Sequence, residues 1–206
     1  MALSEGTSTQ QPTNMSTNLK YLTMVFFAAM AIIGCKPDEE DDIIAPAPVN
    51  EEELITTMIL SFSGQDGVAD KELRFTDADG DGGGAPILDL DTLRAGANYN
   101  VSILLLNASA NPVDTISNEV LDEGVDHQFF FQPTGADITF AYADADANGA
   151  PIGLSATASA NAASAGTLKV TLRHQPNKSA VGVSVGDITN AGGETDIEVE
   201  FPLVIE

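Results

Sequence analysis

Apolar side chains recur at every second position along several short segments, and this period limits how the chain can fold more than any other feature. Residues 197–205 are one such segment, in which Glu198 and Glu200 stand between the apolar positions. Because successive side chains of an extended strand point to opposite faces, the alternation predicts strands with one face in a core. The same pattern covers residues 54–62, 138–142 and 168–174, and residues 101–106 are almost continuously apolar, as in a central strand.

Clusters of Gly, Asn, Asp and Pro separate these segments, which predicts turns between antiparallel strands. We therefore expect an all-β fold, an antiparallel β-sandwich that is Ig-like in general form. Residues 114–123 do not fit the strand pattern. Asp114 can cap a helix, helix-forming residues follow it, and Gly124 stands at the stop position, so we expect one short helix near 114–123.

The region before the strands has the features of an export signal. Lys20 precedes an apolar run over residues 21–34, and the length of this run suits a signal peptide. A membrane-spanning helix needs a longer run, of about 20 apolar residues. Residues 1–13 are polar and unlike the start of such a signal, so we expect the true start at Met15.

The apolar run ends in Ile32-Ile33-Gly34-Cys35, which resembles the lipobox of bacterial lipoproteins. The resemblance implies that residues 1–34 are removed and that Cys35, the one cysteine of the chain, is lipidated and becomes the first mature residue. A short membrane anchor with an incidental cysteine is the alternative.

Three regions follow from this interpretation: a signal peptide over 1–34, a lipidated acidic and Pro-rich tether over 35–50, and one β-sandwich domain over 51–206. Lys36 followed by acids resembles the signal that sends some Gram-negative lipoproteins to the cell surface, although Pro37 interrupts it. We therefore expect a lipid anchor in the outer membrane, with the cell surface favoured over the periplasmic face.

The charge of the chain is strongly unbalanced. There are 31 Asp and Glu residues against 8 Lys and Arg residues, which gives a formal net charge of -23. Such a surface repels nucleic acids and anionic headgroups and attracts cations, so we expect no nucleic-acid partner. Solubility alone is the alternative explanation of the acidity.

Two acidic loops match the first half of a calcium-binding loop. Alternating carboxylates followed by a Gly bring several oxygens to one centre, as calcium requires. The position that holds a bidentate Glu in an EF-hand is Leu88 in the first loop and Ser155 in the second. Asp and Asn are also common turn residues, so bound Ca²⁺ and plain turn chemistry both stay open. The candidate calcium ligands are Asp77, Asp79 and Asp81 in the first loop and Asp144, Asp146 and Asn148 in the second.

The chain has two histidines, and each continues an apolar stripe at the end of a predicted strand. If those ends meet, His127, His174 and a carboxylate such as Asp126 could bind a transition metal. The alternative is two histidines at the rim of the core, each with its hydrogen bonds satisfied.

The sequence does not favour an enzyme. Lipidation would occupy the Cys35 thiol, the motif H-E-x-x-H is absent from the sequence, and only 2 His are present to serve as a base. We therefore expect a protein that is not an enzyme.

Residues 51–56, 126–129 and 174–199 resemble a family of uncharacterised bacterial lipoproteins. Its members often carry the label "type 1 periplasmic binding fold superfamily protein", which implies a two-lobed α/β ligand binder of about twice this length. The leading expectation is a non-enzymatic binding or accessory lipoprotein, with calcium as a candidate stabilising ion. The alternative is a metal-capture lipoprotein that uses His127 and His174 to serve an outer-membrane transporter.

Overall fold

The computed structural model describes residues 54–79 and 83–206. All of these residues belong to the second of the two units of the chain, Pro48–Glu206. The predicted signal peptide, Cys35 and the tether lie outside the described residues. The described core is built from residues of the second unit alone, so this unit has what it needs to fold by itself.

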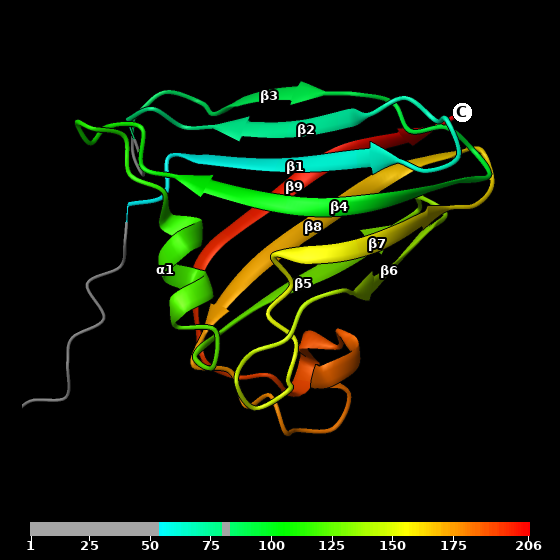
Figure 1. Cartoon of the computed structure of the whole chain (residues 1–206). Helices are drawn as coiled ribbons and strands as arrows, with labels where there is room; N and C mark the ends of the chain where they lie inside the picture. Colours follow the sequence, from blue (N-terminus) through cyan, green and yellow to red (C-terminus); the bar gives the residue numbers. More distant parts are fainter. Residues whose placement is uncertain (1–53, 80–82) are drawn as a thin grey trace, which may run out of the picture. The chain divides into compact units, whose positions relative to one another are not determined.

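The described strands form two antiparallel sheets, which confirms the predicted all-β sandwich (Figure 1). One sheet has six strands in the order β3-β2-β1-β4-β7-β6, and the other has three in the order β5-β8-β9. The six-stranded sheet contains β1 (Thr57–Gly64), β2 (Lys71–Thr76), β3 (Ile87–Leu90), β4 (Ala97–Leu106), β6 (Ile138–Tyr142) and β7 (Ser155–Ala160). The three-stranded sheet contains β5 (His127–Thr134), β8 (Ser164–His174) and β9 (Glu194–Ile205).

The core lies between the facing sides of the two sheets. Strand β4 shows the alternation clearly, since every second residue from Ala97 to Leu105 is buried and those between are exposed. This strand is central in its sheet, as predicted, yet Leu104 is exposed because only one face of the sheet packs on the other sheet. Across the core stand Leu168, Val170 and Leu172 of β8 and Val199, Phe201, Leu203 and Ile205 of β9.

The first predicted strand is correct except at its start. Met58, Leu60 and Phe62 of β1 are fully buried, as their shared parity predicts. Leu54 has the same parity but is exposed, because the pairing of β1 with β4 extends only to Thr57 and Leu54 precedes it.

The predicted helix is present as α1 (Ile116–Asp122), which buries Ile116 and Val120 at one end of the sandwich (Figure 1). Its N-cap is Thr115 rather than Asp114, because the Asp114 carboxylate accepts a hydrogen bond from the Thr115 N–H at 2.8 Å. Gly124 allows a close approach after the helix, since a Cβ there would lie 2.6 Å from Cδ1 of Ile152. Among the described residues no helix is both long and apolar enough to cross a membrane.

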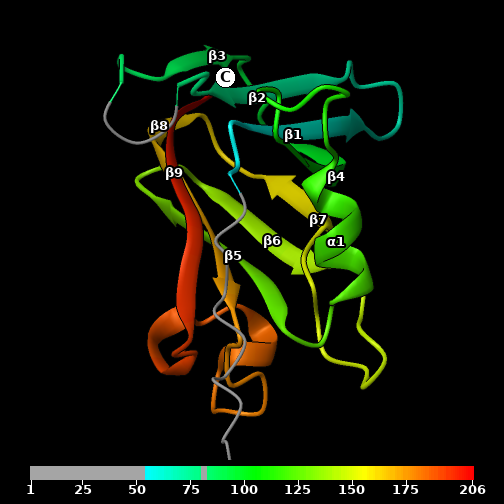
Figure 2. The same cartoon turned by 90° about the vertical axis from the view of Figure 1, so that its left-hand side faces the viewer.

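The two sides of the sandwich differ. On one side the chain around Leu93 bonds to the end of β9: the Leu93 N–H donates to Val204 O and the Glu206 N–H donates to Leu93 O. On the other side the edge strands β5 and β6 approach each other without a ladder of paired residues among those described (Figure 2). We call this second side the open seam.

A loop over residues 175–193 joins β8 to β9 and contains two short 3₁₀ turns, η1 (Val183–Val185) and η2 (Ile188–Asn190). It packs on the sandwich through a small cluster of its own, in which Phe130 of β5 meets Val183 and Ala191. The loop is therefore fixed on β5, beside the open seam.

Candidate functional site

The second acidic loop joins β6 to β7, and its carboxylates accept hydrogen bonds from the loop's own backbone. Asp144 accepts from the N–H groups of Gly153 and Ser155, both at 2.7 Å. Oδ1 of Asp146 accepts from the N–H groups of Asn148 and Ala150 at 2.8 and 3.0 Å. These contacts agree with the turn chemistry that the sequence left open beside calcium.

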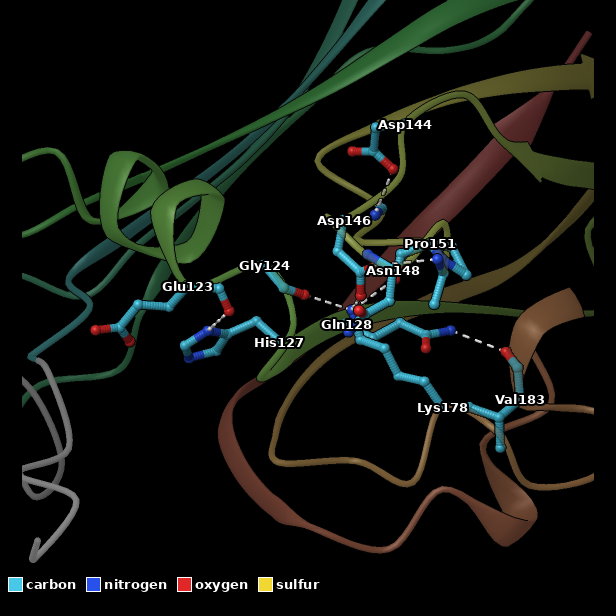
Figure 3. A network of polar contacts seen from close by, with 12 residues as sticks. Glu123, Gly124, His127, Gln128, Asp144, Asp146, Asn148, Pro151, Lys178 and Val183 are labelled. Atoms are coloured by element: carbon cyan, nitrogen blue, oxygen red, sulfur yellow. Dashed lines mark hydrogen bonds and ion pairs between the residues drawn. The ribbon is translucent and has the colours of Figure 1, made fainter.

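The remaining oxygen of Asp146 binds an ammonium group (Figure 3). Nζ of Lys178 lies 2.9 Å from Oδ2 of Asp146 and also donates to the carbonyl oxygens of Gly124 and Pro151. The Asp146 side chain is 1% exposed and that of Lys178 is 9% exposed. A lysine therefore supplies positive charge to this oxygen cluster, and bound calcium here stays a prediction.

Burial and the charge of Lys178 shift the pKa of Asp146 in opposite directions. Burial raises its pKa, but the hydrogen bond and charge of Lys178, together with two backbone N–H groups, outweigh burial and hold the pKa below its usual value. Asp146 is therefore ionised, and its contact with Lys178 links the β6–β7 loop to the 175–193 loop.

The first acidic loop joins β2 to β3, at the opposite edge of the same sheet. Oδ2 of Asp79 accepts from the Gly84 N–H at 2.8 Å, and this contact is the main cause that lowers the pKa of Asp79. Asp77 lies in the same described stretch, whereas Asp81 lies outside the described residues. Strands β1 and β4 stand between the two hairpins, so the two acidic loops do not form one site.

The two histidines, whose meeting the sequence left open, lie side by side. His127 of β5 and His174 of β8 are directly paired, and their rings stack with centroids 4.9 Å apart and planes 8° apart. Nδ1 of His127 lies 3.1 Å from the carbonyl oxygen of Glu123 (Figure 3). Because a carbonyl oxygen only accepts, Nδ1 carries the proton in this contact and Nε2 is turned elsewhere.

The carboxylate that faces this pair is Asp196 rather than the suggested Asp126. Nε2 of His127 lies 3.7 Å from Oδ2 of Asp196, whereas the Asp126 side chain is exposed. The pairing of β8 with β9 explains the difference: Leu172 pairs with Ile197 and Arg173 with Thr195, so Asp196 is the extra residue of a β-bulge. A bulge redirects a side chain, which simple alternation cannot predict.

No group of three His, Cys, Asp or Glu side chains in the described part of the chain is already arranged to hold a metal ion. The parallel stacking of the two imidazoles is one reason. A metal lies in the plane of each imidazole that binds it, and two parallel planes at this separation do not share one ion.

Sequence reasoning missed a small pocket at the open seam. It has a volume of about 70 Å³. The rings of Phe131 and Phe140 stack beside it, with centroids 4.6 Å apart and planes 7° apart. Val185 is 82% exposed, so the pocket is reachable from solvent. We call this the seam pocket; it is lined by Phe131, Pro133, Phe140, Tyr142, Val185 and Gly186.

Hydrogen bonds fix one wall of the seam pocket. The Tyr142 hydroxyl donates to Phe129 O at 2.6 Å and accepts from Nε2 of Gln128 at 3.1 Å. The same Gln128 nitrogen donates to Val183 O at 2.8 Å, which ties the 175–193 loop to β5 (Figure 3). Burial, the largest influence, raises the pKa of Tyr142 to about 12, so this wall stays neutral at physiological pH.

The parity of these aromatics was visible in the sequence. Phe140 and Tyr142 share a face with the buried Ile138, which predicted that all three line the core. Ile138 is buried and Phe140 packs against the core, as predicted, but Phe140 and Tyr142 are only half-buried because β6 is an edge strand. The sequence carries no signal for which edge strands meet there.

No family model, no curated protein and no solved structure matches this chain at a significant level. The resemblance to a lipoprotein family therefore stays a prediction that rests on the quoted segments.

Proposed function

We propose that this chain is a non-enzymatic lipoprotein, anchored through Cys35 in the outer membrane, that binds an apolar side chain of an envelope partner in the seam pocket. The carrying observation is a pocket with a preformed aromatic wall, reachable from solvent at the open seam, where the described strands form no ladder. Pockets of this kind, already formed and lined by aromatics, are common ligand sites. The cell surface is favoured over the periplasmic face as its location.

The size of the pocket limits what it holds. About 70 Å³ suits part of one aliphatic side chain rather than a large ligand. Full burial of such a side chain contributes about 1.5–3 kcal/mol, which alone gives weak binding. A partner therefore needs further contacts around the pocket, as an accessory module in a larger assembly would have.

The negative charge of the protein limits which partner segments can bind at the seam pocket. None of the six residues that line the seam pocket is charged. Asp187 follows Gly186 directly, and the chain as a whole carries a net charge of -23. The partner segment is therefore an apolar side chain flanked by basic residues, because the field of the protein attracts cations to the rim.

The test uses residues 48–206 and the peptide acetyl-Lys-Leu-Lys-amide, followed by amide chemical shifts in NMR. We expect saturable shifts at residues 140–142 and 184–186, with a dissociation constant on the order of 1 mM. The peptide acetyl-Glu-Leu-Glu-amide has the same apolar residue with opposite charge, and we expect it to bind at least about threefold more weakly.

Two valines of the loop give a matched pair of variants. Val185 lines the seam pocket and Val181 does not, yet they are 82% and 85% exposed, so replacing either leaves the core intact. Val185→Ser should weaken binding of the basic peptide about threefold, and Val181→Ser should not change it. Equal binding by both variants, or shifts spread over the whole surface, would contradict the proposal.

A further inference from the structure

We propose that His127, His174 and Asp196 form a binding site for a transition metal ion, Zn²⁺ or Cu²⁺, at the end of the three-stranded sheet, completed by rotation of the His174 ring. This site is separate from the seam pocket and does not depend on it. The two imidazoles and one carboxylate come from three neighbouring strands, β5, β8 and β9.

His127 is already oriented as a metal ligand. Its Nδ1–H donates to Glu123 O, which fixes the ring and leaves Nε2 as the ligand atom. Metal-binding histidines usually donate their other nitrogen in this way, and such contacts set the tautomer before the ion arrives. The imidazole side chain is 11% exposed, so water competes weakly for it.

Asp196 is oriented toward the same nitrogen. Its Oδ2 lies 3.7 Å from Nε2 of His127. A tetrahedral ion with bonds of about 2.0–2.1 Å holds two of its ligand atoms about 3.4 Å apart, so only a few tenths of an ångström separate the pair from a shared ion. The β-bulge directs Asp196 here, and bulges are frequent beside functional sites.

His174 is the ligand that must move. Its ring stacks parallel to that of His127, which keeps the two ring planes from meeting at one ion. The His174 side chain is half-buried, at the last residue of β8. Its backbone pairs directly with that of His127, so the proposed site requires rotation about the side-chain bonds of His174 and no change in strand pairing.

Two imidazoles and one carboxylate favour borderline metals over hard cations. Imidazole suits zinc and copper, whereas calcium and magnesium prefer sites made of oxygen atoms. Copper should bind more tightly than zinc, following the usual order of affinities.

The test is calorimetric titration of metal-free residues 48–206 with ZnCl₂ and with CuCl₂, together with NMR of the two histidine rings. The chain contains only 2 His, both in this unit, so shifts of the ring protons report this site alone. We expect one ion per chain, a perturbation of both rings, and no perturbation of the rings by CaCl₂ at the same concentration.

Three variants separate the proposed ligands from the acidic surface. His174→Ala removes the movable ring, Asp196→Asn keeps the shape of the third ligand without its charge, and Asp126→Asn alters an exposed acid beside His127. The first two should each weaken zinc binding about tenfold or more, and the third should leave it unchanged. Absence of ring shifts at millimolar zinc and copper would overturn the site, and unchanged affinity in Asp196→Asn would overturn its third ligand.

Discussion

Lys178 shows how a residue far away in the sequence can bind within a loop whose spacing resembles a calcium motif. Asp144, Asp146 and Asn148 match a calcium loop by spacing, but the loop is closed by its own N–H groups and by the ammonium of Lys178. The sequence could not predict this contact, because Lys178 is 32 positions from Asp146 and lies in a different loop.

Lys178→Met should lower the free energy of unfolding by about 3 kcal/mol, because it leaves a buried carboxylate and two carbonyls without their cation. Lys169→Met is the matched control, since Lys169 forms its ion pair with Glu198 on the surface and its loss should change stability little. Urea unfolding of both variants measures the difference. Millimolar CaCl₂ should partly restore Lys178→Met and leave the parent protein unaffected; equal stability of the two variants would contradict the anchoring role of Lys178.

Tyr142 gives a prediction at alkaline pH. Burial raises its pKa to about 12 from the usual value of 10.0, so the folded state holds the phenolic proton more tightly than the unfolded chain. The resulting stabilisation is complete below pH 10 and is lost as the pH rises toward 12.

Urea unfolding at several pH values between 10 and 12 should show that the parent protein loses stability more steeply with rising pH than Tyr142→Phe does. Tyr142→Phe is itself expected to be less stable at neutral pH, because the hydrogen bonds of the Tyr142 hydroxyl with Phe129 O and Gln128 Nε2 are lost. Parallel stability curves for the two proteins would show that Tyr142 is not the titrating group.

At the scale of elements, the strongly alternating strands were predictable, whereas β2, β3, β7 and the pairing of all strands were not. Alternation arises because the two faces of a strand meet different surroundings, so the strands containing Phe62, Phe140 and Phe201 could be found from local sequence. The seam pocket and the Asp196 bulge depend instead on which strands lie at the edges and on register, which are set by packing between distant segments.

Strand β8 lies between β5 and β9 and offers a test of how tightly the smaller sheet is packed. A Cβ at Gly166 would lie 2.1 Å from the backbone oxygen of Thr134, so Gly166→Ala forces backbone to move. We expect a loss of about 2–3 kcal/mol in the free energy of unfolding.

Gly149→Ala is the control for that substitution. Gly149 has a φ of +83° and open space around it, so the variant should lose only about 1 kcal/mol from backbone strain. Thermal melting of the two variants distinguishes steric conflict from strain, and a smaller effect at Gly166 than at Gly149 would contradict the packing argument.

At the scale of the whole molecule, the proposed lipid anchor determines the location of the domain in the cell envelope. Expression of the full chain in a Gram-negative host should yield a mature protein that begins at Cys35 and carries lipid, and Cys35→Ala should stay unprocessed. Mass spectrometry of the membrane fraction checks both. An intact leader with an unmodified sulfur on the mature protein would rule out the lipoprotein interpretation. The two proposed binding sites would not be affected, because their tests use residues 48–206 alone.

The last strand, β9, affects whether neighbouring copies of this protein can associate through their sheet edges. Strand β9 ends its sheet, and a terminal strand can act as a template on which identical chains polymerise. Pro202 lacks the N–H that such growth requires, and Glu198 and Glu200 would bring like charges together in a stack. Many copies held close together would therefore repel one another rather than build fibrils.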